Sequence, residues 1–505
     1  MKKFLALILC MLMVLSLVAC GAGGGSEAAS GAKDSITIAS NVDYDTLHPS
    51  DTATEIEANM AIQIYDTLAI RDYEDQTHMI PRVAESWEVS EDGLCYTFHL
   101  RQGVKFHDGS EVTADDVGFS LDLFQNSEYQ SSVVDGMDHW EVVDPYTINI
   151  YTTEVYSPFL LSVGTNLFIA SKAYYESVDE EAFAQNPVGC GPYKWVSHNE
   201  GDSWQFEAFE DYYGGVPEIK TVNFKVIGDT ASMAIGLKAG QLDFAKIDAS
   251  VMSTLEATEG VEIEFAPTTG FAFIAMNNTQ YPFTELAFRQ AVNYAVDREA
   301  IIDAIEEGYA TPNSNMLTPE RQGWSASQKA YTYDVAKAQE LLASIGLQDG
   351  IDLGKFYVPE SYALLAQVVQ SQLQQVGITF EIEQLEANAF YSKLFAGDYT
   401  MSCMHMSLEG DTQQVGMGVC MEGGYANNAI YQNPKMDELF AKAATTIDND
   451  ERTQVYEEIF SIVQEDVPYA ILYNPEMIYA RSSSLNIHTL PIEGYYYLQD
   501  FSWAE

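Results

Sequence analysis

The sequence predicts a mixed α/β protein, in which strands and helices are interleaved along nearly the whole chain. Some short segments alternate apolar and polar residues, as in 378–386, and this pattern is typical of half-buried strands. Others repeat apolar residues three or four positions apart, as in 363–376, which predicts amphipathic helices. No internal repeat is visible. We therefore expect an α/β (mixed α+β) fold, and 505 residues suggest two to four domains.

The remaining elements follow from the same two patterns and from turn residues. Asp297 is expected to cap the second of two successive helices, and Gly240 and Gly377 to end two others. Strands are predicted at 36–40, 87–89, 95–100, 104–107, 203–207, 241–247 and 271–277, and helices at 117–124, 231–239, 285–308, 435–446 and 450–466. Residues 57–70 are predicted to form a short helix that leads to a strand.

The stretch VKFHDGSEVTADDV (104–117) holds one histidine and four carboxylates, which could be metal ligands or acid–base groups. Asp108 and Gly109 form a dipeptide that favours a type I′ hairpin turn, because that turn needs positive φ. Thr113 fits a helix N-cap, with Asp116 in the capping-box position. Each carboxylate therefore has a local structural role, and His107 is expected on a hairpin strand. We predict that this stretch is structural.

The first twenty residues follow the plan of a secretory signal peptide (1–20). Two lysines precede an apolar run that ends at Ala19 and Cys20. A small residue before a cysteine at this place resembles a bacterial lipobox, in which the thiol is lipidated. Residues 21–34 are rich in Gly, Ser and Ala and predict a flexible tether. We expect an extracytoplasmic protein, lipid-anchored through Cys20 to the outer face of the cell membrane, or periplasmic in a cell with an outer membrane.

The charge of the chain excludes one class of partner. The formal net charge is −51, from 75 acidic and 24 basic residues. Such a surface repels phosphate backbones, so we expect no nucleic-acid binding.

The cysteines and the nearby soft ligands raise a metal hypothesis. Cys403, Met404, His405 and Met406 are adjacent, and sulfur with imidazole suits copper or nickel. Alternate residues of a strand face opposite sides, so at most two could share a site, and we expect a strand leaving the core. No CxxC pair occurs. We expect free thiols, although a bridge between Cys403 and Cys420 stays open.

Motifs of enzymes are missing from the sequence. There is no G-x-S-x-G, no H-E-x-x-H and no Walker loop, and GMGVCMEGG lacks the Rossmann spacing. We therefore predict that the protein is not an enzyme and needs no cofactor or resident metal.

Four stretches, in order, resemble one family, the extracytoplasmic solute-binding proteins of ABC importers in the oligopeptide, dipeptide and nickel-binding group. They are PRVAESWEVSEDGLCYTFHLRQGVKFHDGSEVTADDVGFSLD (81–122), NPVGCGPYKW (186–195), MNNTQYPFTELAFRQAVNYAVDREAII (276–302) and NPKMDELFAKAATTIDNDERTQVYEEIFSIVQEDVPYAILY (433–473).

The resemblance implies a bilobal protein, expected to be monomeric, that encloses a solute by hinge closure and delivers it to permease subunits. It implies a discontinuous domain I (35–56, 187–266 and 487–505), an inserted domain II (57–186) and a domain III (267–486). The ligand-contacting residues it implies are Asn41, Tyr44, Leu47, Gly189, Cys190, Asn277, Met406, Ser407, Glu409 and Asp411, with Glu409 or Asp411 holding an ammonium group.

The chain departs from the family in ways that leave the ligand open. Peptide-binding members carry a tryptophan where Met406 or Ser407 stands, and Cys190 stands where threonine is usual. Dipeptide-type members use an arginine after the strand at 355–359, where this chain has Glu360. An oligopeptide is the expected ligand, with nickel, a chelated metal or an oligosaccharide as alternatives. A surface sensory protein on the same fold is the alternative of another class.

Overall fold

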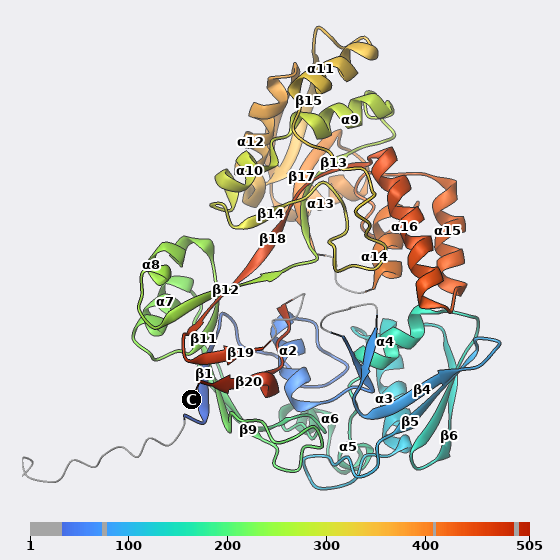
Figure 1. The fold of residues 1–505 in the computed structure, drawn as a ribbon, viewed down its shortest axis with the longest axis vertical. Coiled ribbons are helices and arrows are strands. Elements are labelled where there is room, and N and C mark those ends of the chain that lie inside the picture. The colour runs from blue at the N-terminus through green and yellow to red at the C-terminus, as the bar shows by residue number, and fades with distance from the viewer. Residues whose placement is uncertain (1–32, 73–77, 408–410, 489–493, 505) are drawn as a thin grey trace, which may run out of the picture.

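The computed structural model describes residues 33–72, 78–407, 411–488 and 494–504 (Figure 1). The predicted signal peptide, Cys20, Glu409 and most of the predicted tether lie outside the described residues. Within the described residues, no helix is both long enough and apolar enough to cross a membrane. The fold is the expected mixture of helices and sheets, and its separate apolar cores divide it into three regions, named I, II and III below.

Region I lies at the lower left of Figure 1. Its central strand β1 runs parallel to β10 and β11, and α2 packs on it through Met60, Ala61 and Ile64. Its elements are β1 (Ser35–Ser40), α2 (Glu55–Ile64), β8 (Tyr193–Asn199), β9 (Ser203–Ala208), β10 (Thr221–Val226), α7 (Thr230–Lys238), β11 (Phe244–Ile247), α8 (Met252–Glu256), β12 (Val261–Pro267), β19 (Leu485–Ile487) and β20 (Phe501–Trp503).

Region II lies beside it and holds a four-stranded antiparallel sheet in the order β4-β5-β7-β6. Helix α3 buries Val117, Leu121 and Phe124 in its core, as the sequence predicted. Its elements are β2 (Ala69–Arg71), β3 (Met79–Pro81), β4 (Ala84–Val89), β5 (Cys95–Leu100), α3 (Ala114–Gln125), β6 (Met137–Asp144), β7 (Thr147–Thr152), α4 (Pro158–Asn166), α5 (Lys172–Ser177) and α6 (Glu180–Gln185).

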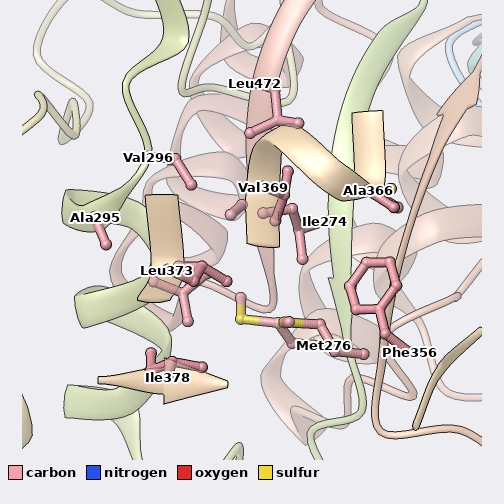
Figure 2. Close-up of a cluster of buried hydrophobic side chains, with 14 of the residues drawn as sticks. Ile274, Met276, Ala295, Val296, Phe356, Ala366, Val369, Leu373, Ile378 and Leu472 are labelled. Atoms are coloured by element: carbon pink, nitrogen blue, oxygen red, sulfur yellow. The ribbon is translucent and has the colours of Figure 1, made fainter. Parts of the chain in front are cut away.

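Region III forms the upper part of Figure 1, with helices on both faces of its sheet. Along β13, Ile274 and Met276 face one core and Phe273 and Ala275 face the other. Figure 2 shows the first core. The elements are β13 (Phe271–Met276), α9 (Leu286–Ala295), α10 (Arg298–Ile305), β14 (Ala310–Pro312), α11 (Val335–Ser344), β15 (Ile351–Pro359), α12 (Ala363–Gln374), β16 (Ile378–Leu385), α13 (Ala387–Phe395), β17 (Met401–Met406), α14 (Thr412–Cys420), α15 (Pro434–Thr445) and α16 (Asn449–Asp466).

One long strand joins regions I and III. β18 (Tyr469–Ser482) pairs with β13 through its first residues and with β11 and β12 through its last, so one ten-stranded sheet runs through both regions. The chain crosses a second time between β12 and β13 (Figure 1). A hinge of two crossing segments fits closure of one region on the other.

The register along β18 fixes which strand ends point into the space between these regions. β11 runs antiparallel to β18, with Ile247 opposite Ile478, so its carboxyl end points toward region III. β1 is parallel to β11 and points the same way. In region III, β17 ends at Met406 opposite Phe271, the first residue of β13 after the crossing. The carboxyl ends of β1, β11 and β17 therefore point toward one another.

Regions II and III also touch, on the side away from β18 (Figure 1). The backbone N–H of Ser157 donates to the carbonyl of Ala444 at 2.7 Å, and its hydroxyl donates to that of Ala443 at 3.1 Å. These bonds join the start of α4 to the end of α15.

The structure confirms most predicted elements and corrects two in the stretch 104–117. The expected strand at 104–107 is reduced to a single bridge between Lys105 and Glu111. The turn is not type I′, because Gly109 alone has positive φ (90°) and its N–H donates to the carbonyl of Phe106, which makes it the fourth turn residue. Asp108 instead accepts bonds from the N–H and hydroxyl of Ser110.

Two predicted boundaries also differ from the packing. Helix α2, most of which falls in the predicted inserted segment 57–186, buries its apolar face in region I. The last residues of β18, predicted within 267–486, pair with strands of region I because the strand is long enough to span both regions.

Candidate functional site: the cavity between regions I and III

A cavity of about 420 Å³ opens at the carboxyl ends of β1 and β11. Part of its wall is formed by Ser40, the last residue of β1, and by Asn41 and Val42, which follow the strand. Lys246 of β11 and Asp248, which follows β11, also line it. In open sheets with parallel strands, ligands bind at the carboxyl ends of those strands. The cavity therefore lies where this topology places a ligand, on the side of region I that faces region III.

The first turn of α2 also lines the cavity, and its geometry is fixed by capping. The side chain of Thr54 accepts from the N–H of Glu57, and the Glu57 carboxylate accepts from the N–H groups of Ala53 and Thr54 at 2.9 and 3.0 Å. Glu57 also accepts from the N–H of Asp45, which holds the loop after β1. This capping box leaves the side chain of Glu55, the first helical residue, at the cavity.

Lys246 and Glu55, which both line the cavity, form an ion pair. Lys246 Nζ lies 2.9 and 2.7 Å from the two carboxylate oxygens of Glu55. Lys246 is the exposed residue of β11, whose other three side chains are buried, so the strand directs the ammonium group out of the core. The side chains of Lys246 and Glu55 are 45% and 40% exposed. Both charged groups are accessible to a solute.

The facing edge of region III is formed by three strands that end together. β15 and β16 are parallel. The hydroxyl of Thr400 donates to the carbonyl of Lys355, and two residues later the hydroxyl of Ser402 donates to the carbonyl of Tyr357, so β17 runs in the same direction as β15. A second cavity of about 550 Å³ lies at the ends of β15 and β16, and its wall consists of Pro359, Glu360, Ser361, Gln384, Leu385, Glu386 and Ala387.

A half-buried polar cluster lies near the end of β17. The His405 ring nitrogen Nε2 lies 2.7 Å from the hydroxyl of Tyr473, which donates to Glu306 at 2.8 Å, and Tyr362 packs against the same imidazole. Burial lowers the pKa of His405, and the nearby Glu306 acts against that shift. The imidazole is thus held by protein groups in this structure.

The structure places five of the predicted ligand-contacting residues in the interior. Leu47 and Tyr44 belong to the core of region I, and the hydroxyl of Tyr44 accepts a bond from Trp195 Nε1. Asn277 is buried and its amide donates to the carbonyls of Gly397 and Tyr399. In this structure these side chains contact protein and do not line either cavity.

Gly189 and Cys190 are buried where regions I and II meet. A Cβ on Gly189 would lie 2.1 Å from the carbonyl oxygen of Ile64, so the close backbone approach requires glycine. Cys190 is fully buried among the apolar residues of region II, and burial raises the pKa of its thiol. In this structure Gly189 and Cys190 therefore have packing roles, and their contact with a ligand stays a prediction.

Four predicted residues remain at the edges facing the space between regions. Asn41 lines the first cavity, Met406 is the last residue of β17, and exposed Ser407 follows it. Asp411 caps α14, where its carboxylate accepts from the N–H of Gln414 at 2.8 Å. Burial raises the pKa of Asp411. The hydrogen bond from Gln414 and the positive charge of Arg71 in region II both act to lower this pKa. Glu409 lies outside the described residues.

The soft ligands predicted near β17 do not converge. Cys403 is buried in one core and Met404 in the other, as strand periodicity requires. Burial raises the pKa of the Cys403 thiol, which disfavours the thiolate that binds metals. Cys403 and Cys420 are both free and belong to different cores, so the open question of a bridge is settled against it.

Among the described residues, one group could hold a metal ion. One ligand atom each of His48, Asp51 and Glu180 lies within 4.8 Å of the others. His48 Nδ1 faces Ser50 Oγ at 3.1 Å and Asp51 at 3.4 Å, while its buried Nε2 has no hydrogen-bond partner. A metal-bound imidazole normally donates its other N–H to an acceptor, so this arrangement suits a structural His–Asp pair better.

Sequence reasoning missed Lys246 and Glu55. Lys246 alone is polar in the strand Phe244–Ile247, and Glu55 immediately follows the capping residue Thr54. These local signals predict exposure and a helix start. Their meeting across 191 positions depends on the tertiary fold.

Comparisons with known proteins identify the family. The model of the bacterial extracellular solute-binding proteins, family 5, matches residues 78–418. The chain is similar to the glutathione-binding protein GsiB of Salmonella paratyphi A, with 29% identity over 90% of this chain and 91% of that protein. Two solved structures are similar: HbpA2 of Haemophilus parasuis (TM-score 0.86, 23% identity, 93% of this chain and 100% of that one) and the ABC transporter substrate-binding protein CtaP of Listeria monocytogenes (TM-score 0.84, 25% identity, 94% and 100%).

These relatives are substrate-binding proteins rather than enzymes. The family-matched segment spans more than half of the chain and includes parts of all three regions. The chain therefore belongs to the family 5 extracellular solute-binding proteins, the binding components of ABC importers for peptides and related solutes.

Proposed function

We propose that the protein captures an oligopeptide between regions I and III and delivers it to the permease of an ABC importer. The observation that carries this proposal is the cavity at the carboxyl ends of β1 and β11, which faces the carboxyl ends of β15, β16 and β17. Two crossing segments allow the regions to close. Relatives named for glutathione binding support a peptide-like ligand.

Each side of this space would have a different role. Strand ends and the first turn of α2 offer polar groups from region I, and Met406 and Ser407 continue β17 from region III. Enclosure lets backbone groups hold a varied ligand while a few charged groups orient it. The proposed monomer keeps a domain I built from region I, an inserted domain II and a domain III, with α2 and the end of β18 assigned to domain I.

The ligand can be identified directly. The full-length chain, extracted from membranes in mild detergent and purified, is denatured, and the released small molecules are analysed by mass spectrometry. Oligopeptides are expected. Recovery of a nickel chelate or an oligosaccharide instead would contradict the peptide assignment and support one of the alternatives. If the purified protein binds no peptide when offered a mixture, the peptide assignment is overturned, whereas a neighbouring permease gene distinguishes transport from the sensory alternative.

Asp411 is the proposed partner of a ligand ammonium group. It also caps α14, so the test must separate the two roles. Asp411→Ser keeps a good capping side chain and removes the charge. The variant should retain its melting temperature and lose affinity for peptides with a free amino terminus, while amino-acetylated peptides bind as before. Equal affinity of variant and parent for free-amine peptides would assign Asp411 to capping alone.

A lipid on Cys20 is proposed to hold the protein at the membrane. Two acyl chains or more give stable anchoring, since each buried methylene contributes about 0.8 kcal/mol. Cys20→Ser should move the protein from the membrane fraction to the medium or the periplasm. Retention of the variant in washed membranes would show another anchor.

A further inference from the structure

The ion pair of Lys246 and Glu55 is placed in the cavity without a structural task that demands it there. Both side chains are well exposed, and an exposed pair of this kind contributes little to stability. Glu55 lies at the first position of α2, where the helix dipole and water would still stabilise its carboxylate if the ammonium group left. Replacing one partner by an equivalent group from solution is therefore easy.

A ligand carboxylate is the group that fits this exchange. It has the same charge and oxygen geometry as Glu55, so it can accept the same two bonds from Lys246 Nζ. When the regions close, water leaves the cavity and the attraction between ammonium and carboxylate grows. The new pair would thus be stronger than the exposed pair it replaces.

The facing edge of region III offers no competing cation within the described walls. Its cavity is lined by the acidic residues Glu360 and Glu386, and Glu306 lies in the cluster near the end of β17. Among the described residues that line either cavity, Lys246 is the single basic one. A carboxylate entering this strongly acidic protein would be repelled by region III and attracted to one place in region I.

We propose that Lys246 is the residue that recognises a carboxylate of the ligand, and that Glu55 is an internal counter-ion which this carboxylate displaces. The inference rests on the proposed peptide function and adds a chemical requirement to it. Peptides with a free carboxyl end are favoured over the same peptides with an amidated end.

The test uses two random libraries of tripeptides to hexapeptides made without Asp and Glu, one with free and one with amidated carboxyl ends. The full-length detergent-purified protein, freed of bound ligand by unfolding and refolding, is mixed with both libraries together. Bound peptides are separated by gel filtration and counted by mass spectrometry. The parent protein is expected to enrich free-end peptides at least about 10-fold, since bonds to charged groups carry roughly this discrimination.

Two variants and a matched control give the proposal its direction. Lys246→Gln should abolish the preference, and Glu55→Gln should increase retention of free-end peptides up to about 5-fold by removing the internal competitor. The control pair is Lys435 and Glu458 in region III, 2.6 Å apart with side chains 49% and 46% exposed and outside both cavities. Lys435→Gln and Glu458→Gln change the net charge identically and should leave the preference intact.

The possible results separate the role of Lys246, the role of Glu55 and peptide binding itself. Equal retention of the two libraries by the parent, or an unchanged preference in Lys246→Gln, would overturn the role of Lys246 while leaving peptide binding in place. Weaker retention of both libraries by Glu55→Gln would show that Glu55 holds a ligand cation, which also overturns the proposal. Retention of no peptide from either library by refolded parent protein would contradict the proposed function itself.

Discussion

Two charged parts of the molecule differ in how their charged groups are bonded. The stretch 104–117 contains His107 and four carboxylates, and the cavity wall contains Glu55, Lys246 and Asp248. In the stretch, His107 and Asp116 are held by backbone groups nearby or in an adjoining segment. In the cavity, Lys246 and Glu55 pair with each other, and both side chains stay partly exposed to solvent.

His107 shows how complete the bonding in the first part is. Its Nε2 lies 3.0 Å from the carbonyl of Gly191, and the N–H of Gly189 donates to its Nδ1 at 3.4 Å. The backbone N–H of His107 donates to the carbonyl of Gly189. A neutral imidazole has one donor and one acceptor, so both are used. Exchangeable partners, rather than a crowd of charged residues, therefore mark the proposed place of a solute.

The largest expected loss of stability comes from a substitution in the 189–191 segment, which contacts His107. Gly189→Ala would put a methyl group against the carbonyl of Ile64, a backbone atom that cannot move aside. The free energy of unfolding should fall by about 3 kcal/mol or more, or the chain should fail to fold. Denaturant unfolding followed by circular dichroism measures the change.

Gly228→Ala is the matched control for this substitution. Gly228 has no positive φ, and the nearest atom to a Cβ there lies 3.9 Å away. Its stability should change by less than about 1 kcal/mol. Equal losses in the two variants would mean that the close approach at Gly189 is not what holds this segment.

The second effect concerns pH. Burial lowers the pKa of His107 to about 4, from 6.5 in the unfolded chain. The unfolded state therefore takes up a proton first as the pH falls, and stability is lost between pH 6.5 and 4, by up to about 3 kcal/mol. His107→Gln should remove this part of the loss. Parallel stability curves for parent and variant over this range would contradict the assignment.

The third effect tests the N-cap of α3. Asp116 accepts bonds from the N–H and hydroxyl of Thr113 at 2.9 and 2.8 Å and from the N–H of Lys172 at 3.1 Å. Asp116→Ala should lower the free energy of unfolding by about 0.5–2 kcal/mol and leave peptide affinity unchanged. A large loss of affinity with unchanged stability would return the stretch 104–117 to the candidate sites.

The smallest effect belongs to the cavity. Lys246→Gln and Glu55→Gln should each change the free energy of unfolding by less than about 1 kcal/mol, because the pair is exposed. Thermal unfolding of the ligand-free variants checks this. A loss of about 2 kcal/mol, the upper end of the range expected for Asp116→Ala, would mean that the pair holds the fold, and the contrast between the two charged parts would disappear.

Much of the fold could be predicted because its signals are local. The buried strand Phe271–Met276, the cap at Asp297 and the helix end before Gly377 all follow from neighbouring residues. The failures share one cause. Whether residues 104–107 pair as a strand, and which core receives α2 or the end of β18, depends on partners far away in the sequence.

The site was predicted less well for the same reason. Family resemblance indicated loops such as 41–47 and 189–191, but the resemblance does not say which side chain of a loop turns inward. Asn41 lines the cavity, whereas Leu47 and Tyr44 fill the core. Lys246 and Glu55 carry ordinary strand and helix-start signals, and only the meeting of β11 with α2 makes them a pair.

Hydrogen–deuterium exchange with and without a bound peptide tests the central claim most directly. The account predicts that the ligand slows exchange in 38–42, 54–59 and 244–248 of region I and at 404–407 of region III, the strand ends and helix start that meet at the proposed site. Exchange in 104–117 should stay the same. Protection of 104–117 with no change at the cavity walls would contradict the account.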